Sequence, residues 1–258
     1  MPGPILIFDS GVGGLSVVAP LRRQLPGVAL AYACDNAMLP YGIRPDEWLV
    51  ARVLSVCEAA VAASRCGVLV VACNTASTLA LDALRARLDV PVVGTVPAIK
   101  PAARVSQSRH IGLLATSATV ARPYTERLIQ AFAADCRVTR VAADALVEQA
   151  ERLVAGEPVD RDVVAQATAP LWEAPDLDTV VLGCTHFPLL RAHIAEAAPR
   201  PVTLVDSGEA IARRAAQLAV DPPPRQGRDP SFSTAPDARL ARALSRYAFA
   251  EPGLLAVG

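Results

Sequence analysis

The segments that decide the fold are VLVVACNTAS at residues 68–77 and TVVLGCTHFP at residues 179–188. Each begins with a short run rich in Val and Leu, which is typical of a strand buried on both faces. Each run ends in a small residue and a cysteine, Cys73 in the first segment and Cys184 in the second. Ligands of open α/β sheets bind beyond the carboxyl ends of the strands. The two segments therefore predict a site with one thiol on each side.

Strand-like runs alternate with helical patterns along the whole chain. The helical stretches are rich in Ala, Leu and Arg, as in Trp48–Ala63 and Ser77–Leu88. This alternation predicts an α/β fold built from βαβ units with right-handed crossovers and mostly parallel sheets. The strands that we expect are Ile5–Phe8, Val28–Ala33, Val68–Ala72, Pro91–Gly94, Ile111–Ala115, Cys136–Val141, Val180–Gly183 and Val202–Val205.

A faint internal repeat indicates two similar lobes. Residues Ile5–Gly14 and Gly112–Val120 both run from a strand into a turn of Ser, Thr or Gly, and a cysteine follows each at a similar distance. Pro97 and Pro101 mark a boundary between the lobes near residues 95–101. Residues 221–258 contain three consecutive prolines, and they predict a loop followed by a final strand or helix.

The composition limits the classes of protein. The chain has 258 residues, of which 52% are hydrophobic and 19% charged, so it can bury a large core. The formal net charge is zero, so nothing points to nucleic acid or to an anionic membrane as a partner. No apolar run approaches the roughly 18 residues of a membrane-spanning helix, and the start lacks the basic segment of a signal peptide. The six cysteines contain no CxxC pair, which predicts reduced thiols of a cytoplasmic protein.

Two cofactor hypotheses find little support. A pyridoxal phosphate enzyme needs a lysine, and the only lysine, Lys100, lies between Pro97 and Pro101 without a supporting motif. The turn SGVGGL at residues 10–15 fails the dinucleotide pattern, because Ser16 stands where the last glycine belongs. We interpret it as a tight turn that exposes the preceding aspartate and Ser10, with an ordinary capped strand-to-helix turn as the alternative.

Metal binding is the main chemical competitor at the two cysteines. Cys73, Cys184 and His186 together have the ligand types of a Cys₂His zinc site. No other ligand pair has metal spacing, and His193 lies seven residues from His186, off its face. We therefore expect no metal and no cofactor.

Polar residues distinguish Cys73 and Cys184 from the other cysteines. Hydrogen-bonding side chains follow both directly, Asn74, Thr75 and Ser77 after the first and Thr185 and His186 after the second. Pro188 suits the first turn of a helix, which places Cys184 near a helix N-terminus. The dipole there favours a thiolate or a substrate carboxylate. We interpret three other cysteines as core residues, namely Cys57, Cys66 and Cys136. Cys34 lies at the end of a predicted strand, and its role stays ambiguous.

Four motifs together resemble the glutamate racemases of the Asp/Glu racemase family. They are IFDSGVGGLS at residues 7–16, LPYG at 39–42, ACNTAS at 72–77 and LGCTHFPLL at 182–190. They occur in the family order, and their combination is specific although each alone is not. The two cysteine segments separate this group from the aspartate and hydantoin racemases. Beyond residue 190 the likeness is weak, since Ser231–Ala235 is only a loose echo.

The resemblance implies two α/β lobes with the active site in the cleft between them. Because the chain end returns to the first lobe in that family, the first lobe would comprise residues 1–96 and 206–258, and the second residues 97–205. The implied activity is cofactor-independent interconversion of L- and D-glutamate. D-glutamate is a building block of bacterial peptidoglycan, so a role in cell-wall synthesis and cell shape follows.

Inversion of an α-carbon requires a proton to leave one face and another to arrive on the opposite face. Two acid/base groups accomplish this, and donors must also stabilise the charge that develops on the carboxylate. By resemblance the acid/base residues are Cys73 and Cys184, with Asp9 assisting the first and His186 the second. The implied substrate contacts are Asp9, Ser10, Tyr41, Gly42, Asn74, Thr75, Thr185 and His186. Roles for Thr116, Thr119 and Glu148 stay open, and Glu151 competes with Glu148.

Other functions remain compatible with these residues. One is a racemase of a related amino acid such as aspartate, or a cysteine-based decarboxylase or isomerase of the same fold. Another is a non-catalytic module that binds a carboxylate or inhibits a protein, against which the intact Cys73 and Cys184 argue. The expected partner is the small-molecule substrate alone. The sequence does not determine oligomeric state, and a homodimer is compatible with it.

Overall fold

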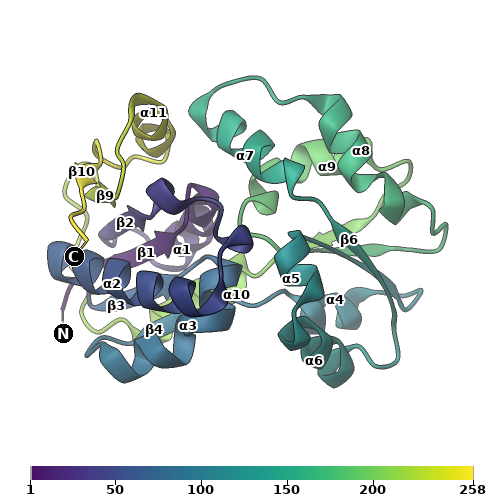
Figure 1. Cartoon of the computed structure of the whole chain (residues 1–258), viewed down its shortest axis with the longest axis horizontal. Coiled ribbons are helices and arrows are strands. Elements are labelled where there is room, and N and C mark those ends of the chain that lie inside the picture. Colours follow the sequence, from purple (N-terminus) through teal and green to yellow (C-terminus); the bar gives the residue numbers. More distant parts are fainter. Residues whose placement is uncertain (1, 258) are drawn as a thin grey trace. The chain divides into compact units, whose positions relative to one another are not determined.

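The computed structural model describes residues 2–257 and resolves them into two compact units. Unit 1 is formed by the chain up to Thr95, by Val154–Gly156 and by the chain from Gly208 onward. Unit 2 is formed by Val96–Leu153 and Glu157–Ser207. Figure 1 follows the chain from its purple start in unit 1 to its yellow end in the same unit.

Unit 1 is built on a parallel sheet. Within the described residues its strand order is β10-β9-β2-β1-β3-β4. The bounds are β1 (Ile5–Asp9), β2 (Leu30–Cys34), β3 (Val68–Val71), β4 (Val92–Gly94), β9 (Ser231–Ser233) and β10 (Gly253–Leu254). Strands β1 and β3 lie inside the sheet, so their continuous apolar runs are buried on both faces, as the sequence predicts.

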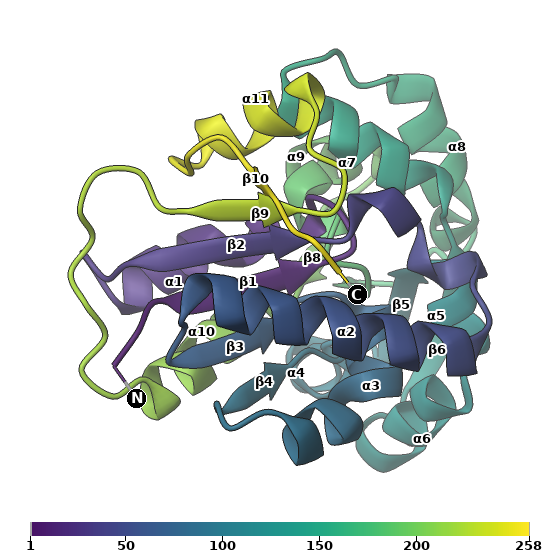
Figure 2. The ribbon, with the colours of Figure 1, turned by 60° about the vertical axis from the view of Figure 1, so that its left-hand side comes forward.

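Helices cover both faces of this sheet. In Figure 2 helices α2 and α3 lie in front of it, while α1 and α10 lie behind. The core between the sheet and the front helices joins Leu6 and Phe8 to Val53 and Leu84. The helical elements of unit 1 are η1 (Gly13–Val17), α1 (Val18–Gln24), η2 (Asn36–Met38), η3 (Tyr41–Ile43), α2 (Asp46–Ser64), α3 (Asn74–Arg87), α10 (Gly208–Leu218) and α11 (Ala238–Arg246).

Unit 2 repeats this plan on a smaller parallel sheet. Within the described residues the strand order is β6-β5-β7-β8. The strands are β5 (His110–Ala115), β6 (Arg137–Ala142), β7 (Thr179–Leu182) and β8 (Thr203–Val205). The helical elements are α4 (Ile99–Val105), α5 (Ser117–Ala121), α6 (Pro123–Phe132), α7 (Ala145–Ala155), α8 (Arg161–Trp172), η4 (Phe187–Leu190) and α9 (Arg191–Ala197).

The side chains of β5 show why its sequence is apolar throughout. Ile111 and Leu113 pack with Ile99 and Ile129 of α4 and α6, whereas Leu114 packs into a second core with residues of α7, α8 and α9. A strand with a hydrophobic core on each side cannot alternate polar and apolar residues. The α/β fold class with two parallel sheets flanked by helices is therefore confirmed.

The expected strands are all present, and the tail, for which we expected a loop and then one final strand or helix, contains β9, α11 and β10. Strand β9 pairs in parallel with β2, and β10 with β9. These strands are short, and their sequences, Ser231–Ser233 and Gly253–Leu254, lack the apolar run that marks the other strands. Their pairing depends on an edge of the sheet that is far away in the sequence.

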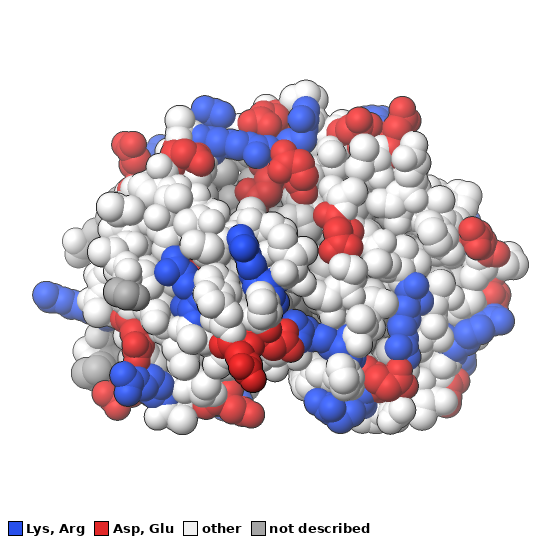
Figure 3. Space-filling view, in the orientation of Figure 1, with Lys and Arg blue, Asp and Glu red and all other residues white. Residues whose placement is uncertain are grey.

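The surface charge is mixed. Figure 3 shows basic and acidic side chains interspersed over the face in view, in keeping with a formal net charge of zero. Within residues 2–257 no helix is both long enough and apolar enough to span a membrane.

Candidate active site

Each unit places one thiol just beyond the carboxyl end of an inner strand. Cys73 follows β3, which lies between β1 and β4, and Cys184 follows β7, which lies between β5 and β8. Cys73 is 6% exposed and Cys184 is 9% exposed. The two thiols thus occupy equivalent positions in two similar sheets, at the edge where α/β proteins bind ligands.

Cys73 stands at the N-cap of helix α3. Its carbonyl oxygen accepts the Ser77 backbone N–H at 2.9 Å. Its Sγ lies 3.8 Å from Ser10 Oγ, and Ser10 Oγ lies 3.3 Å from Asp9 Oδ1. Ser10 therefore stands between the thiol of Cys73 and the carboxylate of Asp9.

Asp9 ends strand β1 and has no exposed surface. Its Oδ1 accepts the Gly11 N–H at 3.0 Å, which folds the turn back onto the carboxylate. Gly14 lies so close that a Cβ there would come within 3.1 Å of Asp9 Cβ and of Tyr32 Oη. Gly14 thus serves close packing around this carboxylate, and the turn that we expected to expose Asp9 and Ser10 leaves both side chains buried.

Cys184 belongs to a thiol, imidazole and carboxylate arrangement. Cys184 Sγ lies 3.8 Å from His186 Nδ1, and His186 Nε2 lies 2.8 Å from Glu151 Oε1 of helix α7. His186 is 3% exposed. Burial lowers the pKa of His186, but the hydrogen bonds to Cys184 and Glu151 outweigh it and raise the pKa well above its ordinary value. The electrostatics therefore favour an imidazolium at His186, between the Glu151 carboxylate and the Cys184 sulfur.

The chain near Cys184 depends on a small residue before it and a proline after it. A Cβ on Gly183 would lie 2.9 Å from Leu113 Cδ1, so glycine allows the segment to pack against β5. Pro188 lies in the first turn of η4, which is a short 3₁₀ segment rather than an α-helix. Helix α9 continues directly from η4 at Arg191, so Cys184 lies near the start of a helical segment, as the sequence predicts, whereas Cys73 is itself the N-cap of helix α3.

The other predicted contacts come from both units and are buried, apart from the half-buried Gly42. Tyr41 and Gly42 form most of η3, and Asn74 and Thr75 begin α3, all in unit 1. Thr185 lies between Cys184 and His186 in unit 2. The exposed fractions are 5% for Ser10, 2% for Tyr41 and 7% for each of Asn74, Thr75 and Thr185.

The structure also distinguishes the residues that the sequence left open. Glu151 contacts His186, whereas Glu148, one turn earlier in α7, is exposed. Thr116 caps α5 and lies 3.1 Å from Thr119, Oγ1 to Oγ1. No sequence signal separates Glu151 from Glu148, because both lie on the same helix and only packing shows which carboxylate meets the histidine.

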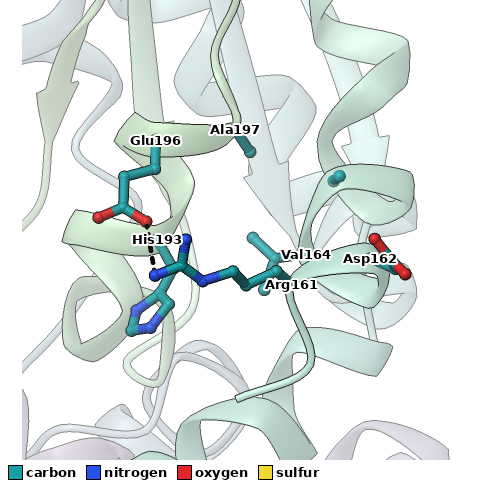
Figure 4. Close-up of a pocket in the computed structure, with 7 residues that line it drawn as sticks. Arg161, Asp162, Val164, His193, Glu196 and Ala197 are labelled. Atoms are coloured by element: carbon teal, nitrogen blue, oxygen red, sulfur yellow. Dashed lines mark ion pairs between the residues drawn. The ribbon is translucent and has the colours of Figure 1, made fainter.

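The cavity in Figure 4 lies elsewhere, between the first turns of helix α8 and helix α9. It has a volume of about 220 Å³, and an ion pair between Arg161 and Glu196 crosses it at 3.6 Å. His193 lines it, with its buried Nδ1 lacking a hydrogen-bond partner among the described residues. His193 thus lies apart from the residues around Cys184.

The chain is similar to known proteins over most of its length. The Asp/Glu/Hydantoin racemase family model matches residues 13–215. Glutamate racemase of Shewanella sp. (strain MR-7) is 50% identical over 221 residues, 86% of this chain and 81% of the relative.

Two solved structures extend the likeness to the whole fold. Escherichia coli glutamate racemase in complex with L-glutamate and the activator UDP-MurNAc-ala superposes with a TM-score of 0.93, at 43% identity and with all of both chains covered. Glutamate racemase isoform RacE1 of Bacillus anthracis gives a TM-score of 0.83 at 30% identity, with 99% of this chain and 97% of that chain covered. This chain therefore belongs to the Asp/Glu/Hydantoin racemase family, among its glutamate racemases.

Proposed function

We propose that this protein interconverts L- and D-glutamate by exchanging protons with the α-carbon through Cys73 and Cys184, without a cofactor. The observation that carries the proposal is a matched pair of buried thiols, each beyond an inner strand and each with polar partners. The glutamate racemases to which the chain is similar supply the substrate class. We propose further that the D-glutamate made in this way serves peptidoglycan synthesis and that the protein acts in the cytoplasm.

The reaction consists of two balanced proton transfers. A thiolate takes the α-proton, and the electron pair left on the carbon spreads into the α-carboxylate. The opposite thiol then delivers its proton to the other face, so the two sulfur atoms end with exchanged protonation states. A positioned acid or base contributes typically ~10²–10⁴-fold to a rate, and hydrogen-bond donors must stabilise the carboxylate while its charge increases. Ser10, Asn74, Thr75 and Thr185 are the donors proposed for that task.

The two thiols have different surroundings, which suits a reaction that begins with one sulfur as a thiolate and the other as a thiol. The imidazolium of His186 favours a thiolate at Cys184, ready to take the α-proton of L-glutamate. The chain of contacts from Cys73 through Ser10 ends at the Asp9 carboxylate. A negative charge there opposes a thiolate and favours a thiol, ready to donate. We accordingly assign Cys184 to L-glutamate and Cys73 to D-glutamate.

We expect the purified protein to racemise L-glutamate with no added cofactor. The loss of optical activity, followed by circular dichroism, measures this, and aspartate at the same concentration serves as the comparison substrate. Full activity should survive dialysis against a chelator, because the proposed chemistry uses only thiols and hydrogen bonds. Loss of activity after chelation, regained with a divalent metal, would refute the cofactor-independent mechanism, and preference for aspartate would refute the substrate.

A further inference from the structure

Asp35 is a buried carboxylate that the proposed reaction does not use. It follows strand β2, it has no exposed surface, and its backbone N–H donates to the Asp9 carbonyl at 3.2 Å. Arg52 donates to both carboxylate oxygens, at 2.9 Å from Nε and at 2.8 Å from Nη2. Burial alone would raise the pKa of Asp35, but hydrogen bonds from Arg52, Thr234 and Tyr41 outweigh it and lower the pKa. The carboxylate is therefore charged and fully engaged, which suits an anchor rather than a base.

One bond of this anchor leads to the segment of the proposed substrate contacts. The Tyr41 hydroxyl donates to Asp35 Oδ2 at 2.8 Å, so it is committed to Asp35 rather than to a ligand. The Tyr41 ring packs in the same core as Cys73. Segment η3, which begins at Tyr41 and includes Gly42, contacts helix α3, whose N-cap is Cys73. Asp35 thus helps to set where η3 lies against α3.

A second bond leads to the tail of the chain. The Thr234 hydroxyl donates to Asp35 Oδ1 at 2.8 Å and accepts the Ala37 N–H at 3.2 Å. The Thr234 N–H donates to the Cys34 carbonyl at 3.2 Å, directly after the pairing of β9 with β2. The next residue, Ala235, donates its N–H to the Asn36 side chain at 3.2 Å. Thr234 and Ala235 therefore hydrogen-bond to the segment of residues 34–37, which leads from β2 toward η3.

We propose that Thr234 is a positioning residue for the reaction: it holds Asp35, and Asp35 holds Tyr41, so that the Tyr41–Gly42 segment stays beside Cys73. The inference rests on the proposed function in one respect, that this segment contacts the substrate. The weakly matching C-terminal tail thereby becomes part of the machinery. Its role is to fix a binding segment, so its loss should weaken substrate binding more than it slows the proton transfers.

The test compares Thr234→Val with Thr234→Ser in the full-length protein. Valine has the shape of threonine but lacks the hydroxyl, so Asp35 loses a donor and the Ala37 N–H loses its acceptor. We expect KM for glutamate to rise about 3- to 30-fold in both directions with kcat changed less. Serine retains the hydroxyl and should return KM toward the wild-type value. Ser231→Ala, in the adjoining strand β9 but bonded to the Ala250 carbonyl, is the matched control and should leave KM unchanged.

Tyr41→Phe gives an independent variant that breaks the same linkage at its other end. It should also raise KM, and the combination with Thr234→Val should raise KM by less than the product of the single effects, because both act through Asp35. Calorimetric titration with glutamate provides a readout that does not depend on turnover. Unchanged KM and unchanged glutamate affinity in folded Thr234→Val, with wild type active, would overturn the inference alone. A wild type that neither binds nor racemises glutamate would overturn the proposed function and the inference together.

Discussion

Replacing Cys73 or Cys184 with serine is expected to lower the rate of glutamate racemisation at least about 10³-fold in both directions. A positioned acid or base contributes ~10²–10⁴-fold to a rate, and a serine hydroxyl is a far weaker acid than a thiol. Each sulfur is a proton donor in one direction and a base in the other, so neither direction escapes. Initial rates from each enantiomer, measured by circular dichroism, provide the test. Both residues are nearly buried, and serine is close to cysteine in size, so the fold should persist.

Elimination from a substrate analogue tests each cysteine separately, because it needs a base on only one face of the α-carbon. Cys73→Ser retains the base assigned to L-glutamate, so it should still eliminate from the L-form of an analogue with a leaving group on the β-carbon. Cys184→Ser should act only on the D-form. The matched control is Cys136→Ser, because Cys136 is half-buried directly before β6, outside the proposed site, and its substitution should leave the rate unchanged. Racemisation at the wild-type rate in both site variants would refute the assignment of the thiols.

Replacing His186 with asparagine is expected to lower kcat from L-glutamate about 10- to 100-fold, the equivalent of one hydrogen bond to a charged group. The side chain lies between Cys184 and Glu151, so the substitution removes the positive charge that favours the thiolate. Asp9→Asn should instead lower kcat from D-glutamate more, because the amide cannot accept, through Ser10, the proton that Cys73 must lose before it acts as the base. Enantiomers are equally stable, so kcat/KM stays equal in the two directions and each bias in kcat is matched by KM.

The pH profile gives a second measure of the same arrangement. The pKa of His186 is raised, so its positive charge is present through neutral pH and is lost only as the pH rises through that raised value. Without the imidazolium a thiolate forms less readily, and the acidic limb of kcat/KM should move to higher pH in His186→Asn. Glu151→Gln should move it in the same direction by less, and His193→Asn, in the cavity between α8 and α9, should leave it in place. Identical profiles for His186→Asn and the wild type would show that the charge plays no part.

Local pattern was sufficient for the framework of the molecule. A strand that is buried on both faces must be apolar throughout. Runs such as Val68–Val71 and Thr179–Leu182 therefore indicate inner strands of a parallel sheet from the local sequence alone. The residues that follow such a strand lie at the ligand-binding edge of the sheet, which is why Cys73 and Cys184 stand out from the other cysteines. Helix α4 and the short strands β9 and β10 carried no such signal.

Only the tertiary structure shows which side chains from distant parts of the chain contact the residues around the two thiols. Glu148 and Glu151 are equivalent to any local pattern, and the packing of α7 against the segment after β7 selects Glu151 as the partner of His186. Thr234 meets Asp35 across a separation of 199 residues, because β9 pairs with β2 in one register. Secondary-structure periodicity constrains neighbours within a few residues, whereas contacts of this kind depend on the register and packing of whole elements. The sequence by itself therefore determined the thiols and the strands that carry them, and the folded structure determined which charges and hydroxyls surround them.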